Sequence, residues 1–287
     1  MKKAYLYAIA ATCLGGSSGV FIKSLPNLSP IIITFFRFSI PTILIGIFLI
    51  YKRIQPFHKQ YILMFLASCI GALRIFLMIW GITLISMGVA HTLFFIFPIF
   101  VSILGIIFLK ERITKLTVFL LLTAFSGVLI IYSQNGFALE TNNMLGVYIL
   151  LSSAMLHAIF VIIIKYTMNI YSRLEIVFHQ SLIGAILLLP FLILNIKPIS
   201  IAEYSIGISY GVIIGLFTWL LHYTGLKYMK VSHWSILTYI EVPAAIIFGF
   251  IFFQEPITIQ MVIGALFIIG SGTGLILTKY KKQKNNI

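Results

Sequence analysis

Charge is scarce in this sequence, and negative charge most of all. Only 9% of the 287 residues are charged, aspartate is absent, and the six acidic residues are all glutamates. Soluble proteins carry about 25% charged residues, so an ordinary soluble domain is excluded. The lack of aspartate and of paired acids also leaves no evident metal–phosphate site of the kind that an enzyme acting on lipid-linked groups would use.

Cysteine and metal-binding motifs are equally scarce. Cys13 and Cys69 both fall inside apolar runs, where we expect them to pack as small hydrophobic residues rather than form a disulfide. The sequence has no H-E-x-x-H, no pair of C-x-x-C motifs and no Walker loop, and its six histidines are dispersed without metal-ligand spacing. We therefore expect no metal, no cofactor and no enzymatic activity.

Apolar residues, in contrast, dominate the chain. They make up 61% of it, and the mean hydropathy is +1.11. Ten apolar runs are each long enough, or nearly so, to cross a hydrocarbon core of about 30 Å. The prediction is an all-α polytopic membrane protein of ten transmembrane helices with no room for a further domain. The runs cover residues 4–23, 31–50, 61–80, 88–109, 116–132, 144–164, 175–194, 204–225, 233–253 and 257–278.

The basic residues are distributed unevenly between the connecting segments. If the N-terminus is inside, sixteen of the twenty lysines and arginines fall in segments on the inner side, and only Lys23 and Lys197 fall on the outer side. This asymmetry is the positive-inside rule for ten helices with both termini in the cytoplasm. The net charge of +14 therefore reports topology and does not indicate a nucleic-acid partner.

The second half of the chain repeats the first. Each half contributes five spans, and because five is odd the two halves are predicted to enter the membrane with opposite orientation. Inverted repeats of this kind place a substrate site near the midplane of many secondary transporters. At an offset of 144 residues, 97–114 aligns with 241–258, Gly105 with Gly249, and Glu111 with Glu255; at an offset of 142, Arg37 aligns with His179 and Lys23 with Lys165.

Motifs in these spans are similar to those of a known family. A proline lies within the fourth span, the apolar runs close with KERIT and QEPIT, EVPAAIIFG opens at residue 241, and Arg37 lies in the second span. Over roughly residues 4–278 the chain resembles the EamA-type transporters of the drug/metabolite transporter superfamily. The resemblance implies two five-helix repeats, 1–133 and 144–280, that form one structural unit.

The same resemblance implies a multi-pass carrier in the bacterial inner (plasma) membrane. Members of the family move amino acids, nucleosides, drugs or related metabolites, and some are coupled to protons. The chain departs from a symmetric pattern at one position, because Phe97 in the first repeat aligns with Glu241 in the second. Any acidic coupling site is therefore expected to be single.

Glu241 is the only acidic side chain within the long apolar segments. A charge at bilayer depth costs a few kcal/mol or more, so it usually faces a cavity or a partner. Arg37 and Arg74 are each expected about 9 Å from the outer edge, and Glu241 about 18 Å from it. Together they would form a site with cationic and anionic ends, which suits an amino acid. Two alternatives stay open: the arginines extend to the headgroups, or one of them pairs with Glu241.

Aromatic and histidine side chains in the same spans complete the candidate site. Aromatic rings could stack against a ligand, whereas a lone histidine in a membrane helix can equally bond to a neighbouring helix. The candidates for substrate binding are Arg37, Arg74, Glu241, Trp80, Tyr223 and His91. The candidates for proton coupling are Glu241, His157, His179 and His222.

Glycines at a spacing of four residues predict close helix packing. GGSSG at 15–19 matches the G-x-S-x-G motif of hydrolases by letter, but it lies inside a predicted membrane helix without the strand that the motif requires. The pairs Gly15–Gly19, Gly211–Gly215 and Gly270–Gly274 instead fit the small-xxx-small pattern.

The predicted function is secondary active transport of a small metabolite by alternating access, with proton coupling left open. An amino acid or amino-acid-derived compound ranks first as substrate. The expected partners are that metabolite and membrane lipid, with the chain acting as a monomer or homodimer. The alternatives are an integral-membrane enzyme acting on lipid-linked groups and an exporter of cationic drugs.

Overall fold

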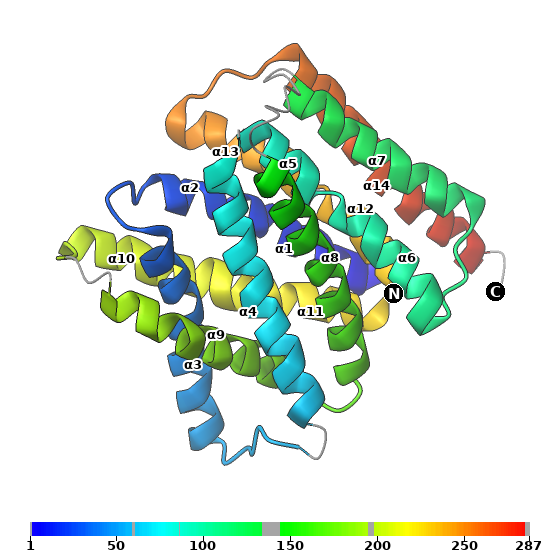
Figure 1. Cartoon of the computed structure of the whole chain (residues 1–287). Coiled ribbons are helices and arrows are strands. Elements are labelled where there is room, and N and C mark those ends of the chain that lie inside the picture. Colours follow the sequence, from blue (N-terminus) through cyan, green and yellow to red (C-terminus); the bar gives the residue numbers. More distant parts are fainter. Residues whose placement is uncertain (1, 59–60, 86, 134–143, 195–197, 285–287) are drawn as a thin grey trace.

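The protein is described by a computed structural model (Figure 1), which covers residues 2–58, 61–85, 87–133, 144–194 and 198–284. The segment 134–143 and the side chains of Lys59, Glu140 and Lys197 lie outside these residues. The described residues are all-helical, without a strand. The helices are α1 (Lys2–Gly16), α2 (Ser18–Lys23), α3 (Pro30–Tyr51), α4 (Tyr61–Leu84), α5 (Met87–Phe94), α6 (Phe97–Leu109), α7 (Lys115–Ser133), α8 (Met144–Thr167), α9 (Arg173–Leu194), α10 (Ile201–Tyr210), the π-helix η2 (Gly211–Thr218), α11 (Trp219–Tyr228), α12 (Val231–Thr238), α13 (Glu241–Phe253) and α14 (Ile259–Lys284).

These helices form ten spans that are long and apolar enough to cross a membrane within the described residues, as predicted. Some spans begin with residues that commonly cap the N-terminus of a helix. Ser29 accepts a hydrogen bond from the Ile32 amide ahead of Pro30 in α3, and Ser200 with Glu203 forms a capping box at α10.

The fourth and ninth spans are both broken, and at equivalent places. The fourth consists of α5 and α6, the ninth of α12 and α13, and all four boundaries differ by the offset of 144 residues. Pro98 and Pro243 lie in the first turns that follow the breaks, where a missing amide hydrogen costs no helical bond. Beyond α6 and α13, Lys110 and Gln254 adopt the same left-handed conformation, with φ of 52° and 54°. The two halves thus share local structure, while their opposite orientation stays a prediction.

The helix packing has the same internal correspondence. The helix α3 packs against its counterpart α9, and α7 packs against α14 at one side of the bundle (Figure 1). The contact of α6 with α8 has its equivalent in that of α13 with α1. Exchanging the halves therefore preserves the main contacts.

Glycine allows the closest helix approaches, although only some predicted pairs do so. A Cβ at Gly211 would lie 2.6 Å from the carbonyl oxygen of Phe36, so the Gly211–Gly215 prediction is confirmed. No atom lies near a Cβ built at Gly19 or Gly270, and those two predictions are wrong. In α1 the close contact is made by Gly16, where a Cβ would lie 2.7 Å from Ala244.

The basic segments gather at one end of the bundle. We call this the basic end and define it by residues 52–58, 110–115, 165–175 and 226–232. It is held together by hydrogen bonds between segments, including Lys230 Nζ to the Arg112 carbonyl at 2.6 Å and Lys165 Nζ to the Leu226 carbonyl at 2.5 Å. The basic residues from which the topology was predicted therefore lie together at one end of the molecule.

Candidate functional site

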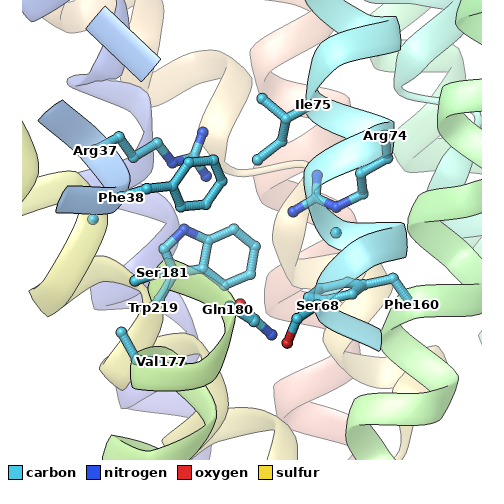
Figure 2. Close-up of a pocket in the computed structure, with 12 residues that line it drawn as sticks. Arg37, Phe38, Ser68, Arg74, Ile75, Phe160, Val177, Gln180, Ser181 and Trp219 are labelled. Carbon is cyan, nitrogen blue, oxygen red and sulfur yellow. The ribbon is translucent and has the colours of Figure 1, made fainter. Parts of the chain in front are cut away.

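A small cavity lies inside the bundle between α3, α4, α8, α9 and the junction of η2 with α11 (Figure 2). Its volume is about 20 Å³, which is room for little more than one water molecule. The lining side chains that carry the chemistry are Arg37, Ser68, Arg74, Phe160, Gln180, Ser181 and Trp219.

Two guanidiniums and one indole dominate the cavity. Figure 2 shows the Arg37 and Arg74 side chains pointing inward from opposite sides. The Cζ atom of Arg37 lies 5.6 Å, and that of Arg74 5.5 Å, from the ring centre of Trp219. Both are within the range of a cation–π contact. Within the described residues, no carboxylate forms an ion pair with either arginine.

Arg74 is deeply buried, at 4% exposure. Its Nη1 donates to Nδ1 of His157 at 3.2 Å, its Cζ lies 4.9 Å from the Phe160 ring, and its Nε has no hydrogen-bond partner in the described part of the chain. Because α4 continues to Leu84, Arg74 is farther from the outer end of its span than the sequence suggested. The Arg74 guanidinium is thus directed into the bundle, toward His157.

His157 supports Arg74 from α8. Since an arginine can only donate, Nδ1 of His157 must accept, and the proton of the neutral ring is then on Nε2. The imidazole stacks on Phe97, with ring centres 4.2 Å apart and planes 5° apart. A histidine predicted for proton coupling thus contacts the arginine of the cavity directly.

Glu241 is the first residue of α13, directly after the break in the ninth span. Its carboxylate lies against Gly15 of α1, where a Cβ would be 3.2 Å from Cδ and Oε1. No ion pair or hydrogen bond to this carboxylate is found in the described residues, so the predicted alternative of a direct arginine pair is not formed.

His91 stacks on Tyr132, with ring centres 5.6 Å apart and planes 7° apart. This contact joins α5 to α7. His91, predicted as a substrate-binding residue, does not line the cavity.

Tyr223 and His222 lie behind the cavity rather than in it. The Tyr223 hydroxyl donates to Oε1 of Gln180 at 2.6 Å, and its ring contacts Trp219. His222 packs between Trp219 and Trp234, with ring centres 5.6 and 5.5 Å away. Both predicted residues belong to the layer that supports Trp219.

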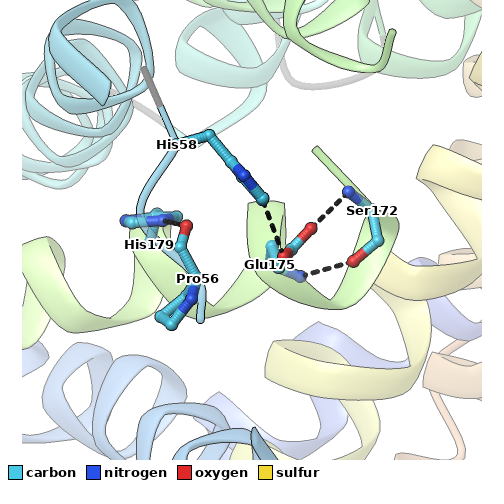
Figure 3. A network of polar contacts seen from close by, with 5 residues as sticks. All are labelled: Pro56, His58, Ser172, Glu175 and His179. Atoms are coloured by element: carbon cyan, nitrogen blue, oxygen red, sulfur yellow. Dashed lines mark hydrogen bonds and ion pairs between the residues drawn. The ribbon is translucent and has the colours of Figure 1, made fainter. Parts of the chain in front are cut away.

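Trp80 and His179 do not line the cavity. Trp80 is 42% exposed and packs against Phe76, away from the cavity. His179 binds the Pro56 carbonyl through Nε2 at 2.8 Å at the basic end (Figure 3). Both residues point elsewhere because the direction of a side chain around its helix depends on packing, which polarity and depth do not reveal.

The contacts of His179 belong to a polar network at the basic end (Figure 3). Nε2 of His58 lies 3.0 Å from Oε1 of Glu175, and Oε2 of the same carboxylate accepts the Ser172 amide at 2.6 Å. Tyr171 packs edge-on to His58, and burial raises the pKa of its hydroxyl. These contacts fix the segment 52–58 against the start of α9.

Three residues of the cavity are absent from the predicted site: Trp219, Gln180 and Phe160. Gln180 carries a signal in the sequence, because it is an amide at the third turn of an apolar span. Nothing in the local sequence of Trp219 distinguishes it from Trp80 as a residue that could line a cavity.

The equivalent glutamates Glu111 and Glu255 have different partners. Glu111 accepts the Val231 amide at 2.8 Å and the Ser232 hydroxyl at 3.0 Å, and thereby caps α12. Glu255 forms an ion pair with Lys23 at the opposite end, and both side chains are about half exposed. Glu111 therefore links two segments of the basic end, whereas Glu255 forms a solvent-accessible ion pair.

Comparison with known proteins places this architecture among transporters. A crystal structure matches 98% of this chain and 99% of its own with a TM-score of 0.86 at 14% identity, a likeness of fold alone. An uncharacterized transporter of Archaeoglobus fulgidus is 29% identical over 282 residues, which is 96% of each chain. A probable terminal-alkyne amino-acid exporter of Streptantibioticus cattleyicolor is 26% identical over 196 residues, covering 67% of this chain and 65% of that protein. The EamA-like transporter family model matches residues 2–133 and 144–278, and the chain therefore belongs to the EamA-like transporter family.

Proposed function

We propose that this transporter is a secondary active carrier for a small metabolite that bears a carboxylate, with an amino acid or amino-acid-derived compound ranked first. The observation that carries the proposal is the pair of guanidiniums. Arg37 and Arg74 reach one cavity from opposite sides, while no carboxylate of the described residues pairs with either.

The chemistry of the arginines supports an anionic ligand. Taking a charge out of water costs several kcal/mol unless a partner compensates for it. For Arg74 the described compensation is a neutral histidine and aromatic faces. A carboxylate would supply the missing charge, and the planar fork of a guanidinium binds it with two parallel hydrogen bonds.

Glu241 supports an amino group at the other end of the ligand. It is a carboxylate inside the bundle's ninth span, and no ion pair to it is found among the described residues. An ionised Glu241 would accept an ammonium group, which a purely anionic metabolite lacks. The name of the exporter from Streptantibioticus cattleyicolor, a relative over two thirds of this chain, points to the same class of substrate.

The size of the cavity supports transport by alternating access. A volume of about 20 Å³ cannot hold an amino acid, so the helices around it must move to admit one. The breaks before Phe97 and Glu241 and the π-helix η2 supply places where the backbone can change without disrupting a continuous helix. Proton coupling, if present, is assigned to Glu241.

Counterflow in proteoliposomes tests the proposal. We expect the wild type to exchange radiolabelled L-amino acids saturably, and we expect Arg37→Ala and Arg74→Ala to raise the half-saturation concentration about tenfold or more, since a charge-assisted hydrogen bond contributes about 1.5–3 kcal/mol. Lysine at either position should restore binding only in part, because it lacks the fork.

Amino-acid amides provide the matched control, because they keep the amino group and lose the carboxylate. Amides should compete poorly with the labelled amino acids for transport by the wild type, and equally poorly for transport by the alanine variants. Normal affinity in both alanine variants would make the arginines structural. A substrate without an anionic group would refute the assignment, and formation of a chemical product would favour an enzyme instead.

The proposal includes a bacterial inner-membrane location with both termini in the cytoplasm. Accessibility tags within 52–58 and after residue 284 should then report the inside, and tags within 134–143 and 195–200 the outside. An external 52–58 segment would overturn both the topology and the inverted orientation of the repeats.

A further inference from the structure

The indole of Trp219 is in contact with both unpaired guanidiniums. Arg37 comes from α3 and Arg74 from α4, yet each Cζ lies within 5.6 Å of the same ring centre. Phe160 meets this ring edge-on, with centres 6.4 Å apart and planes at 88°. Tyr223 contacts it from α11, with centres 5.4 Å apart. The ring therefore has fixed neighbours on several sides.

Two like charges beside one cavity repel each other. In the absence of a carboxylate partner, the electron-rich face of an indole is the strongest aromatic substitute for an anion. Trp219 supplies such a face at the point where both guanidiniums meet the cavity (Figure 2). It thus holds the two forks in place before a ligand arrives.

The π-helix determines where this indole lies. Trp219 is the first residue after η2, whose wider turns allow Thr218 Oγ1 to donate to the Ile213 carbonyl five residues earlier, at 2.9 Å. Within η2, a Cβ at Gly215 would lie 2.3 Å from the Arg37 carbonyl oxygen. The backbone of Arg37 therefore rests directly on the turn that precedes Trp219. Such local π-helical turns are frequent at functional sites.

We infer that Trp219 is a specificity-determining positioning residue: it holds Arg37 and Arg74 apart and facing the cavity, so that the transporter selects ligands whose carboxylate can replace the indole as the partner of the two guanidiniums. The inference rests on the proposed function. It adds a residue that acts through the arginines, and it predicts that selectivity for the carboxylate depends on the π face and not on side-chain bulk.

The test compares Trp219→Phe, which keeps a π face, with Trp219→Leu, which keeps only apolar bulk. The probe is counterflow of a mixture of radiolabelled proteinogenic L-amino acids, competed by the same unlabelled mixture or by the corresponding amino-acid amides. We expect Trp219→Leu to raise the half-saturation concentration about tenfold with little change in maximal rate, and to lose the preference for acids over amides. Trp219→Phe should stay within about threefold of the wild type.

Phe217→Leu is the matched control. Phe217 belongs to the same π-helix but is 52% exposed, so its replacement should leave affinity and the acid-to-amide ratio unchanged. If Trp219→Leu does not fold, the Trp219→Phe variant alone decides, because a tenfold loss of affinity in that variant contradicts the inference.

Two other results would also overturn it: an unchanged acid-to-amide ratio in Trp219→Leu, or equal losses in the Leu and Phe variants. Either would give Trp219 a packing role only. If the wild type moves no amino acid, the proposed function itself fails. If the arginine variants lose affinity and the Trp219 variants do not, the proposed function stands and only this inference fails.

Discussion

One contact occurs twice in this molecule, with different chemistry each time. Helix α6 meets α8 where Phe97 stacks on His157, and α13 meets α1 where Glu241 lies against Gly15. Phe97 and Glu241 are 144 residues apart, and Gly15 and His157 are 142 apart, the same offsets that align the two halves. A duplicated framework has therefore kept the position of a contact while its residues diverged.

The difference shows how one framework can hold two kinds of site. On the α6–α8 side, two rings fill the contact, and the histidine supports Arg74. On the α13–α1 side, a glycine leaves room for a carboxylate without a described ion pair. The Phe97–His157 contact helps to position Arg74, whereas the Glu241–Gly15 contact leaves the carboxylate of Glu241 available to a ligand or a proton.

Replacing Glu241 should have the largest effect of the changes considered at these contacts. We expect Glu241→Gln to abolish transport driven by a pH gradient while the protein remains inserted and folded, because the amide has nearly the same size but cannot exchange a proton. The measurement is uptake into proteoliposomes with and without an imposed pH gradient. Unchanged gradient-driven transport would remove Glu241 from coupling.

Filling the space beside the acid separates its function from packing. Gly16→Ala should destabilise the fold by about 1–3 kcal/mol, because its Cβ would lie 2.7 Å from Ala244 and 2.8 Å from the Ala245 backbone. Gly15→Ala should cost less stability but reduce transport, because its Cβ would meet only the movable Glu241 carboxylate at 3.2 Å. Thermal unfolding and counterflow on both variants check this; equal losses of stability would contradict it.

The two equivalent glutamates sharpen the comparison at the ends of the bundle. Glu111→Ala should destabilise the protein by about 1–2 kcal/mol, the usual loss for a helix cap, since it removes the acceptor for the Val231 amide and the Ser232 hydroxyl. The measurement is the thermal unfolding temperature. Because α12 begins at this cap, a fully stable Glu111→Ala protein would show that the basic end is held by its lysines instead.

Glu255→Ala should have the smallest effect. Its ion pair with Lys23 is about half exposed, and exposed pairs contribute about 0–1 kcal/mol. The unfolding temperature should hardly change, and any effect should fall with added salt. A fall in unfolding temperature as large as that of Glu111→Ala would mean that the two glutamates contribute equally to stability.

The single acid at 241 illustrates what the linear pattern could reveal. Its departure from the repeat is visible in the alignment of Phe97 with Glu241. The helix breaks before these residues were not predicted, because proline alone does not fix them: Pro41 and Pro190 lie inside the continuous helices α3 and α9. Gly15 as its neighbour was not visible, because the contact joins residues more than two hundred positions apart. The packing prediction for Gly15–Gly19 assigned this glycine a different role.

His157 and His179 illustrate the opposite limit. Both are histidines inside apolar spans and were equally plausible as proton carriers. The structure brings one to Arg74 and the other to the Pro56 carbonyl. Alignment of His179 with Arg37 across the repeat did not place it at the cavity, because equivalent positions of a diverged repeat need not keep equivalent neighbours.

The ten apolar spans, their order and the gathering of basic residues at one end all follow from the amino-acid sequence. These properties depend on hydrophobicity and charge along short stretches of chain, which act locally. The meeting of Arg37, Arg74 and Trp219 required the tertiary structure. Depth along a helix can be counted at about 1.5 Å per residue, but direction around it depends on the neighbours that pack against it and, for Trp219, on the π-helix that turns it toward the two arginines.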